Sequence, residues 1–264
     1  MPYWLVALRL ANWGDKLRCP RPTVAGMRIK PELDQATIVL VGRLNPAIFQ
    51  PAWFALHGML GQKEAERSEI QLIQAGVSQF KVDQFELLVL SNRFSITSLD
   101  GHPEHIRDLV ISCFGQNLPH TPVQFLGINR AVHFDTGSFE VRDRVGSRLA
   151  PKDAWGAWGR EIEASPLEPR EARGGMISVV MQQSLRPDGH KGHVQAKVEP
   201  SVRVENSTGI FVDVNDHFDL RGAEQAVQGA SSAVAVLEAN WEASLQRSGT
   251  IIDQIMALTE ECRA

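Results

Sequence analysis

The chain has 264 residues, of which 43% are apolar, and its formal net charge at pH 7 is −4. This length can bury a large core, as one fused domain or as two small ones. The acidic balance gives no electrostatic footprint for nucleic acid, where a clearly basic domain or stripe is expected. No apolar run approaches the roughly 20 residues that a bilayer requires, so we expect a cytoplasmic protein.

The cysteines and the missing motifs narrow the chemistry further. Cys19, Cys113 and Cys262 lie far apart and form no CxxC or CxxH pair, which argues against a disulfide framework and against a structural zinc site. The chain contains no GxxxxGK[ST] loop, strand-borne GxGxxG, HExxH or GxSxG motif. We therefore expect a reducing compartment and no cofactor.

Three segments organise the chain. Residues 1–26 contain Trp4, Trp13 and a Pro-Arg-Pro break, and they match neither the strand nor the helix patterns that follow, so we interpret them as an appended N-terminal segment. This segment is either an amphipathic stretch that packs on the body or a partner, or an extended start. Residues 27–120 form a first α+β half and residues 121–264 a second, as one fused domain.

The first half begins with a strand. The β-branched run at residues 36–44 predicts a buried strand, and Pro51 opens a helix with an apolar face and a half-buried, structural His57. Apolar alternation over residues 70–99 predicts two or three antiparallel strands. Pro103 begins a second helix, whose buried face includes Cys113 and Phe114 and which Gly115 ends.

The second half repeats this order. Residues 121–135, TPVQFLGINRAVHFD, predict one long strand at the seam between the halves. Pro151 opens a helix with Trp155 and Trp158, and the Pro-, Gly- and charge-rich residues 164–175 predict a surface loop. Three strands follow, at about residues 174–185, 193–204 and 209–220, and the Pro187-Asp188-Gly189 sequence predicts a hairpin turn between the first two.

The last predicted element is a long helix over residues 223–258. It places Val234, Leu237, Trp241, Leu245, Ile252, Ile255 and Leu258 near one side, with Gly229 and Gly249 as possible breaks. A helix of about 25 residues spans about 38 Å, which is enough to cross a whole sheet. The stripe therefore packs either on the chain's own sheet or on a second subunit.

The element order predicts an α+β fold. Two tandem β-α-β-β-β-α-like halves would form one curved antiparallel sheet with helices on one face, an architecture similar to the duplicated fold of TATA-binding proteins. At residues 126–130 (LGINR), 92–96 (NRFSI) and 214–218 (VNDHF), followed by the long C-terminal helix, the chain resembles a sporadically distributed family of uncharacterised bacterial proteins. The resemblance covers about residues 36–258 and implies neither a reaction nor site residues.

The densest polar cluster is FVDVNDHFDL at residues 211–220. Alternation places Asp213, Asn215 and His217 on one face of a strand. Together with Asp216, these oxygen and imidazole groups could bind a divalent metal or serve as acid and base. The alternative is a polar strand end that meets solvent, with Asn215 and Asp216 in a turn.

Two further sets contain histidine. Asn129, His133 and Asp135 share a face of the long strand by parity, so His133 and Asp135 could form an oriented base or a surface pair. His190 and His193 flank a hairpin, where they could form a metal pair or lie in a solvated turn. A metal site built on the 211–220 strand would take its remaining ligand from His133 or Asp135.

Three function classes follow from these patterns. We favour a non-enzymatic protein-binding or assembly module of a bacterial multi-component system, with a protein partner or a second copy as its target. Aromatic and apolar helix residues would carry the interaction, namely Trp155, Trp158, Trp241, Leu245 and Ile252. The alternatives are a metal-assisted hydrolase or nuclease that uses Asp213, Asp216 and His217, and a nucleic-acid-binding saddle.

Overall fold

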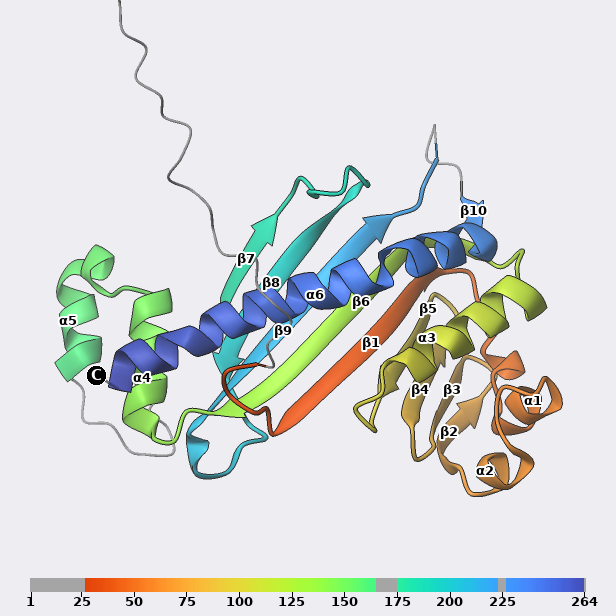
Figure 1. The fold of residues 1–264 in the computed structure, drawn as a ribbon, viewed down its shortest axis with the longest axis horizontal. Coiled ribbons are helices and arrows are strands. Elements are labelled where there is room, and N and C mark those ends of the chain that lie inside the picture. Colours follow the sequence, from red (N-terminus) through yellow and green to blue (C-terminus); the bar gives the residue numbers. More distant parts are fainter. Residues whose placement is uncertain (1–26, 165–174, 223–226, 264) are drawn as a thin grey trace, which may run out of the picture.

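The computed structural model describes residues 27–164, 175–222 and 227–263. The appended segment 1–26, most of the 164–175 loop and the predicted helix start at residues 223–226 lie outside this part. The described strands form one antiparallel sheet in the order β2-β3-β4-β5-β1-β6-β9-β8-β7, and β10 also pairs with β6 (Figure 1). Their bounds are β1 (Leu33–Gly42), β2 (Glu69–Gln74), β3 (Val77–Lys81), β4 (Phe85–Leu90), β5 (Arg93–Ser98), β6 (Pro122–Asp135), β7 (Val179–Gln183), β8 (Gly192–Pro200), β9 (Gly209–Asp219) and β10 (Gln228–Gly229).

Helices lie between strands in each half and between the halves, and the longest helix ends the chain. They are η1 (Pro46–Ile48), α1 (Pro51–Leu56), α2 (Gln62–Glu66), α3 (Glu104–Ile111), the π-helix η2 (Ser112–Asn117), α4 (Phe139–Leu149), η3 (Asp153–Trp155), α5 (Gly156–Ala164), η4 (Glu205–Ser207) and α6 (Ala230–Arg263). The sheet, its helices and the 34-residue α6 confirm the predicted α+β class. Among the described helices, none has the length and apolar content needed to cross a membrane.

The central pair of strands consists of the first strand of each half. β1 and β6 run antiparallel with Ile38 opposite Ile128, and the other strands extend the sheet outward on both sides. Each of these two strands contains a glycine at a position where a side chain would crowd a neighbouring atom. A Cβ atom at Gly42 would lie 2.0 Å from the carbonyl oxygen of Pro122, and one at Gly127 would lie 3.2 Å from the Asn129 side chain.

The two sheet faces differ because the described helices pack on only one of them. Side chains of Ile38, Leu126 and Val214 point toward α3, α4 and α6, and we call this side the helix face. The opposite side, which carries Thr37 and Asn129, is the open face. Figure 1 shows α6 and α3 crossing in front of the strands on the helix face.

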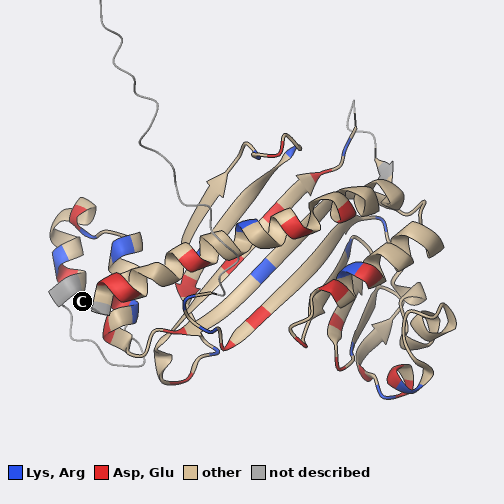
Figure 2. Cartoon of the chain, viewed as in Figure 1, with Lys and Arg blue, Asp and Glu red and all other residues tan. Residues whose placement is uncertain are grey.

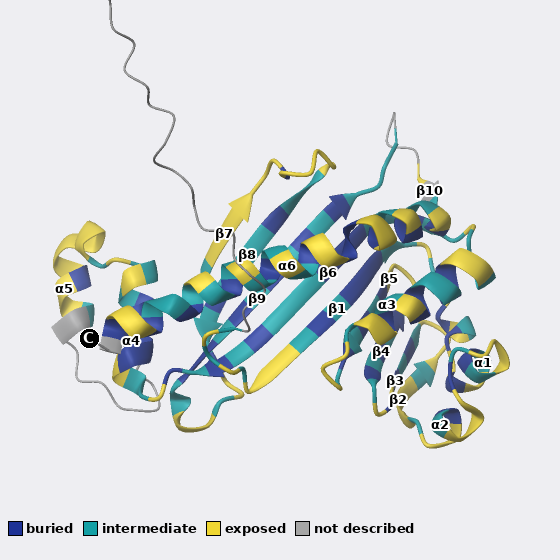
Figure 3. Ribbon diagram, in the orientation of Figure 1, coloured by how far each residue is buried: buried dark blue, intermediate teal, exposed yellow. Residues whose placement is uncertain are grey.

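Two apolar cores lie on the helix face, and α6 spans both. The first core gathers Phe49, Phe94 and Phe114 around the first half and includes Trp241 of α6. The second lies under α4 and includes Ile252 of α6. Dark segments on the inner side of α6 in Figure 3 follow this burial along the helix. The long helix therefore joins the two halves into one body.

A polar layer separates the two cores. Arg130 on β6 forms an ion pair with Asp34 on β1, at 2.7 Å. Beside it on β9, Asp216 forms an ion pair with Arg247 of α6. Gly249, a possible break in the sequence-based prediction, does not interrupt α6. A Cβ atom there would lie 3.0 Å from the Arg130 guanidinium, so glycine gives this cation room beneath the helix.

The local predictions needed four corrections. Residues 69–98 form four strands rather than two or three, because the 69–74 stretch pairs separately at the sheet edge. The helix after Pro103 continues past Gly115 as a π-helix to Asn117. Helix α4 was not predicted, and its polar composition explains why. The described C-terminal helix begins at Ala230, later than the predicted start at residue 223, and continues to Arg263, past the predicted end at residue 258.

Candidate functional site on the open face of the sheet

Strand β9 divides its polar residues between the two faces. Asp213 lies opposite Ala131 and Lys197, and His217 lies opposite Gly127 and His193, so both point to the open face together with Asn215. This confirms the parity argument for these three residues. Asp216 points the other way, so it cannot join Asp213 and His217 in one catalytic group.

Asp216 belongs to a buried charge cluster on the helix face. Its carboxylate accepts hydrogen bonds from Arg186 and Arg247, and the side chains of Asp216 and Arg186 are fully buried. Asp188 completes the cluster at 2.5 Å from Arg186 and 3.3 Å from Arg247. Burial alone would raise the pKa of Asp188, but the hydrogen bonds and charges around it lower this pKa to about 2. The cluster attaches the β7–β8 hairpin and α6 to β9, which is a structural role.

On the open face, flat side chains form a ladder across three strands. The imidazoles of His193 and His217 stack with 4.6 Å between ring centroids, and the Phe125 ring lies 5.2 Å from His217. The Arg221 guanidinium covers Phe125 at 4.7 Å. Asp219 orients Arg221 with hydrogen bonds of 2.8 and 2.7 Å. We call Phe125, His193, His217 and Arg221 the stacking ladder.

His217 is held in its neutral form. Burial lowers its pKa first, and the neighbouring His193 and the arginines lower it further, while Asp219 acts in the opposite direction. A neutral imidazole between two rings presents an aromatic surface rather than a charge. The ring faces contact one another, so the ladder offers ring edges and one fixed cation to a ligand.

His133 and Asp135 lie on the open face but do not form a pair. The Nδ1 atom of His133 shares a hydrogen bond with the Ser201 hydroxyl at 2.8 Å, and its ring packs at a tilt against Phe211, with 4.6 Å between centroids. Asp135 accepts a hydrogen bond from the backbone N–H of Gly137. Burial lowers the pKa of His133, and the positive charge of Arg203 lowers it further. The oriented-base hypothesis thus has no contact to support it.

Uncharged polar residues form a row through the middle of the open face. Successive strand partners across six strands are Gln182, Gln195, Asn215, Asn129, Thr37 and Thr97. The hydroxyls of Thr37 and Thr97 are 2.9 Å apart, and the two glutamines are 3.5 Å apart. At the centre, the buried Oδ1 atom of Asn129 has no hydrogen-bond partner among the described residues. This row supplies donors and acceptors without net charge.

The charges on the open face are largely paired with each other. Lys197 forms an ion pair with Glu199 at 3.1 Å, and Arg221 forms one with Asp219. Asp213, between Lys197 and Ala131, is partly buried, and burial raises its pKa while Lys197 opposes the rise. The open face therefore lacks the excess of cations that binding to a phosphate backbone requires.

The candidate metal ligands do not converge. Within the described residues, no group of three or more histidine, cysteine, aspartate or glutamate side chains is placed to hold a metal ion. His190 packs on Phe218 and lies 3.4 Å from Asn240 of α6, whereas His193 stacks on the open face, so these two do not form a pair. The structure thus provides no geometry for the metal-assisted mechanism.

The predicted interaction residues fall into two groups. Trp155 and Trp158 are 60% and 56% exposed, and their rings meet edge to face at 5.4 Å, so they are available to a partner. Trp241 and Ile252 are buried in the two cores, and Leu245 packs against the first. Placing these three at an interface was wrong, because the stripe of α6 packs on the chain's own sheet.

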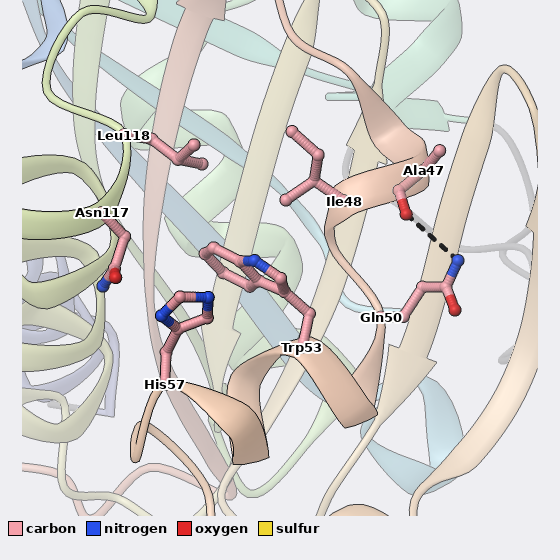
Figure 4. A pocket seen from close by; sticks show the side chains of 7 residues that line it. All are labelled: Ala47, Ile48, Gln50, Trp53, His57, Asn117 and Leu118. Atoms are coloured by element: carbon pink, nitrogen blue, oxygen red, sulfur yellow. Dashed lines mark hydrogen bonds between the residues drawn. The ribbon is translucent and has the colours of Figure 1, made fainter.

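A shallow pocket lies at the outer end of the first half. Its volume is about 350 Å³, and Figure 4 shows the Trp53 indole and the His57 imidazole side by side on one wall. Their ring centroids are 4.8 Å apart, and His57 is exposed rather than half-buried as expected. The Asn117 amide opposite is held by the Ser112 carbonyl at 3.0 Å. The pocket belongs to the helix side of the sheet and is separate from the stacking ladder.

Comparison with known proteins identifies no family for this chain. No protein-family model matches the chain, and no curated protein matches it significantly. Sequence analysis missed Phe125 and Arg221 of the ladder. Arg221 shares parity with His217 and Asp219, which was a usable signal, but Phe125 could not be placed beside them because the pairing of β6 with β9 was not known.

Proposed function

We propose that the chain is a non-enzymatic protein-binding module and that its open face is the recognition surface. The observation that carries the proposal is the stacking ladder on a sheet face that no described helix covers. Arginine is among the side chains that most often dominate the binding energy of protein interfaces, and phenylalanine is enriched in them. Held by three adjacent strands, they lose little conformational freedom on binding.

The chemistry around the ladder favours a protein over nucleic acid. The row of amides and hydroxyls can pair with the backbone and polar side chains of a partner, and the Asn129 oxygen is an acceptor that still needs a donor. Aromatic side chains also stack on nucleic-acid bases. Here, however, the cations Lys197 and Arg221 are neutralised by Glu199 and Asp219. A protein surface with aromatic, apolar and amide groups fits this face best.

Removal of the ladder tests the proposal. We expect wild-type protein to capture a specific partner from an extract of the source cells, and Phe125→Ala/His217→Ala to lose it. Leu56→Ala is the control, because it removes an exposed apolar side chain of α1, on the helix side of the sheet. Binding of the purified partner, measured by calorimetry, should weaken about tenfold or more when such anchors are removed. Equal capture by the ladder variant would refute the assignment of this face.

A nucleic-acid assay separates the alternative. Fluorescence anisotropy with single-stranded RNA and DNA oligonucleotides should show no binding at physiological salt. Submicromolar binding that falls steeply with salt, and that the ladder variant loses, would support the saddle hypothesis instead. A divalent-metal titration with phosphodiester and ester substrates should likewise show neither binding nor turnover.

We also propose that the two halves are copies of one unit. In both halves the first strand lies at the centre of the sheet, the chain passes through helices to an outer edge, and the strands then return inward. Failure of residues 36–118 and 121–258 to superimpose as one α+β unit would contradict the duplication.

A further inference from the structure

β7 forms an outer edge of the sheet without the usual protection. The stretch from Met176 to Leu185 contains no charged residue and no proline, and its pairing with β8 from Val179 to Gln183 has no bulge. Figure 2 shows β7 without charge, and Figure 3 shows it largely exposed. Natural sheets usually block such edges with charges, proline or bulges, because the unpaired backbone groups attract another strand.

The opposite edge of the same sheet carries these devices. β2 begins with Glu69, and its register shifts between Ile70 and Leu72. The charged helix α2 directly precedes it. Because β2 is protected and β7 is not, pairing between a β7 and a β2 edge is disfavoured. An open chain of head-to-tail copies is therefore disfavoured as well.

The exposed apolar residues around β7 are arranged symmetrically. Ile177, Met181 and Leu185 are 72%, 69% and 85% exposed and follow each other at intervals of four residues. If two copies of β7 pair antiparallel about Met181, Met181 lies opposite itself and Val179 lies opposite Gln183 of the other copy, while Ile177 and Leu185 flank the strand two residues beyond either end. On the other side of the ribbon, Val180 lies opposite Gln182. The edge is thus complementary to itself.

We propose that β7 binds a second copy of the same chain, by twofold antiparallel strand pairing centred on Met181. The contact supplies backbone hydrogen bonds to the side of β7 that pairs with no described strand, and it covers Ile177, Met181 and Leu185. It is isologous and closed, so assembly stops at two chains. The pairing keeps both open faces on the same side of the joined sheet. This inference is independent of the proposed function, because it uses none of the ladder residues.

Molar mass and a charged substitution give the first test. Light scattering of the full chain at micromolar concentration should give twice the 29.2 kDa mass of one chain. Met181→Lys should raise the dissociation constant of the dimer about tenfold or more, because like charges directly opposite each other in a sheet repel. Ile70→Lys places the same charge on the β2 edge, where 58% of Ile70 is exposed, and should leave the dimer unchanged.

Cysteine crosslinking gives the second test and fixes the register. In a Cys19→Ser background, Met181→Cys should form an intermolecular disulfide on mild oxidation with diamide. Directly opposed residues lie about 4.5 to 5.5 Å apart between Cα atoms, within the range that a disulfide bridges. Val180→Cys is the control, because its copies lie diagonally, at about 7 to 8 Å, and should not crosslink. Cys113 and Cys262 are buried.

The outcomes decide the matter in either direction. A dimer that Met181→Lys dissociates, with a crosslink at position 181 and none at 180, supports the proposal. A monomer throughout the micromolar range overturns it. A dimer that survives Met181→Lys, that Ile70→Lys disrupts equally, or that crosslinks at 180 rather than 181 also overturns it. The crosslinking arm remains decisive if the lysine variant fails to fold.

Discussion

Replacement of Asp216 by alanine tests whether this residue is structural or catalytic. Asp216 lies on the helix face of β9, where its carboxylate contacts Arg186 of the β7–β8 hairpin and Arg247 of α6. A catalytic carboxylate can usually be removed with little loss of stability. A carboxylate that neutralises buried cations cannot, because the cations are then left uncompensated.

The structure sets the size of the expected loss. Breaking a buried ion pair by removing one partner costs about 3–5 kcal/mol. Arg186 keeps Asp188 at 2.5 Å and the carbonyl of His217 at 3.0 Å, so we expect the lower end, about 3 kcal/mol. A loss of about 3 kcal/mol is a large part of a typical domain stability of about 5–15 kcal/mol. For a chain of this size, it lowers Tm by about 6 to 12 °C.

Thermal and urea unfolding of matched variants measure this loss. Asp213→Ala serves as the control, because it removes the same group from the same strand on the opposite face. In a double-mutant cycle with Arg247→Ala, the two losses of stability should not be additive, since both variants break the same ion pair between Arg247 and Asp216. If Asp216→Ala melts like wild type, the buried cluster does not stabilise the fold and our reasoning is wrong.

Three further predictions follow from burial. Trp241→Ala should lower the free energy of unfolding by about 3–5 kcal/mol. Trp241→Phe should lower it less, because the buried indole N–H has no partner among the described residues. Unchanged melting of the alanine variant would place the indole outside the core. Asp213→Asn should raise Tm at pH 7, because burial raises the pKa of Asp213 and makes its charged form unfavourable. Asp253→Asn should lower Tm at the same pH, because hydrogen bonds from Arg28 lower the pKa of Asp253 and stabilise its charged form. The pKa of His217 is lower in the folded state than its unfolded value of about 6.5, so its neutral form contributes stability above that pH, and this stability is lost as the pH falls. His217→Gln should therefore flatten the decline in Tm between pH 7 and 5. An unchanged profile of Tm against pH would contradict the lowered pKa.

Strand parity was determined by the sequence alone. Successive residues of a strand point to opposite faces, so the placement of Asp213, Asn215 and His217 together needed no knowledge of neighbours. The order of strands and helices likewise predicted the α+β class, because each element has its own apolar period. Both signals are local in the chain.

The partners of these residues were decided by tertiary structure. Arg186 and Arg247 reach Asp216 across 30 and 31 residues of chain, and Phe125 reaches His217 only because β6 pairs with β9. Nothing in the residues around position 216 specifies which cations arrive there. For that reason a cluster that resembled three metal ligands in sequence is divided between two faces of the sheet.

The C-terminal helix shows the same division. Its apolar stripe was visible in the sequence, because a helix repeats every 3.6 residues and its own residues determine the stripe. Which surface covers that stripe depends on the sheet that the rest of the chain builds. Here the stripe spans two cores, burying Trp241 in one and Ile252 in the other, while the uncharged edge at Met181 is left open. Local periodicity determines the face of an element, and only the packed sheet determines whether that face meets its own chain.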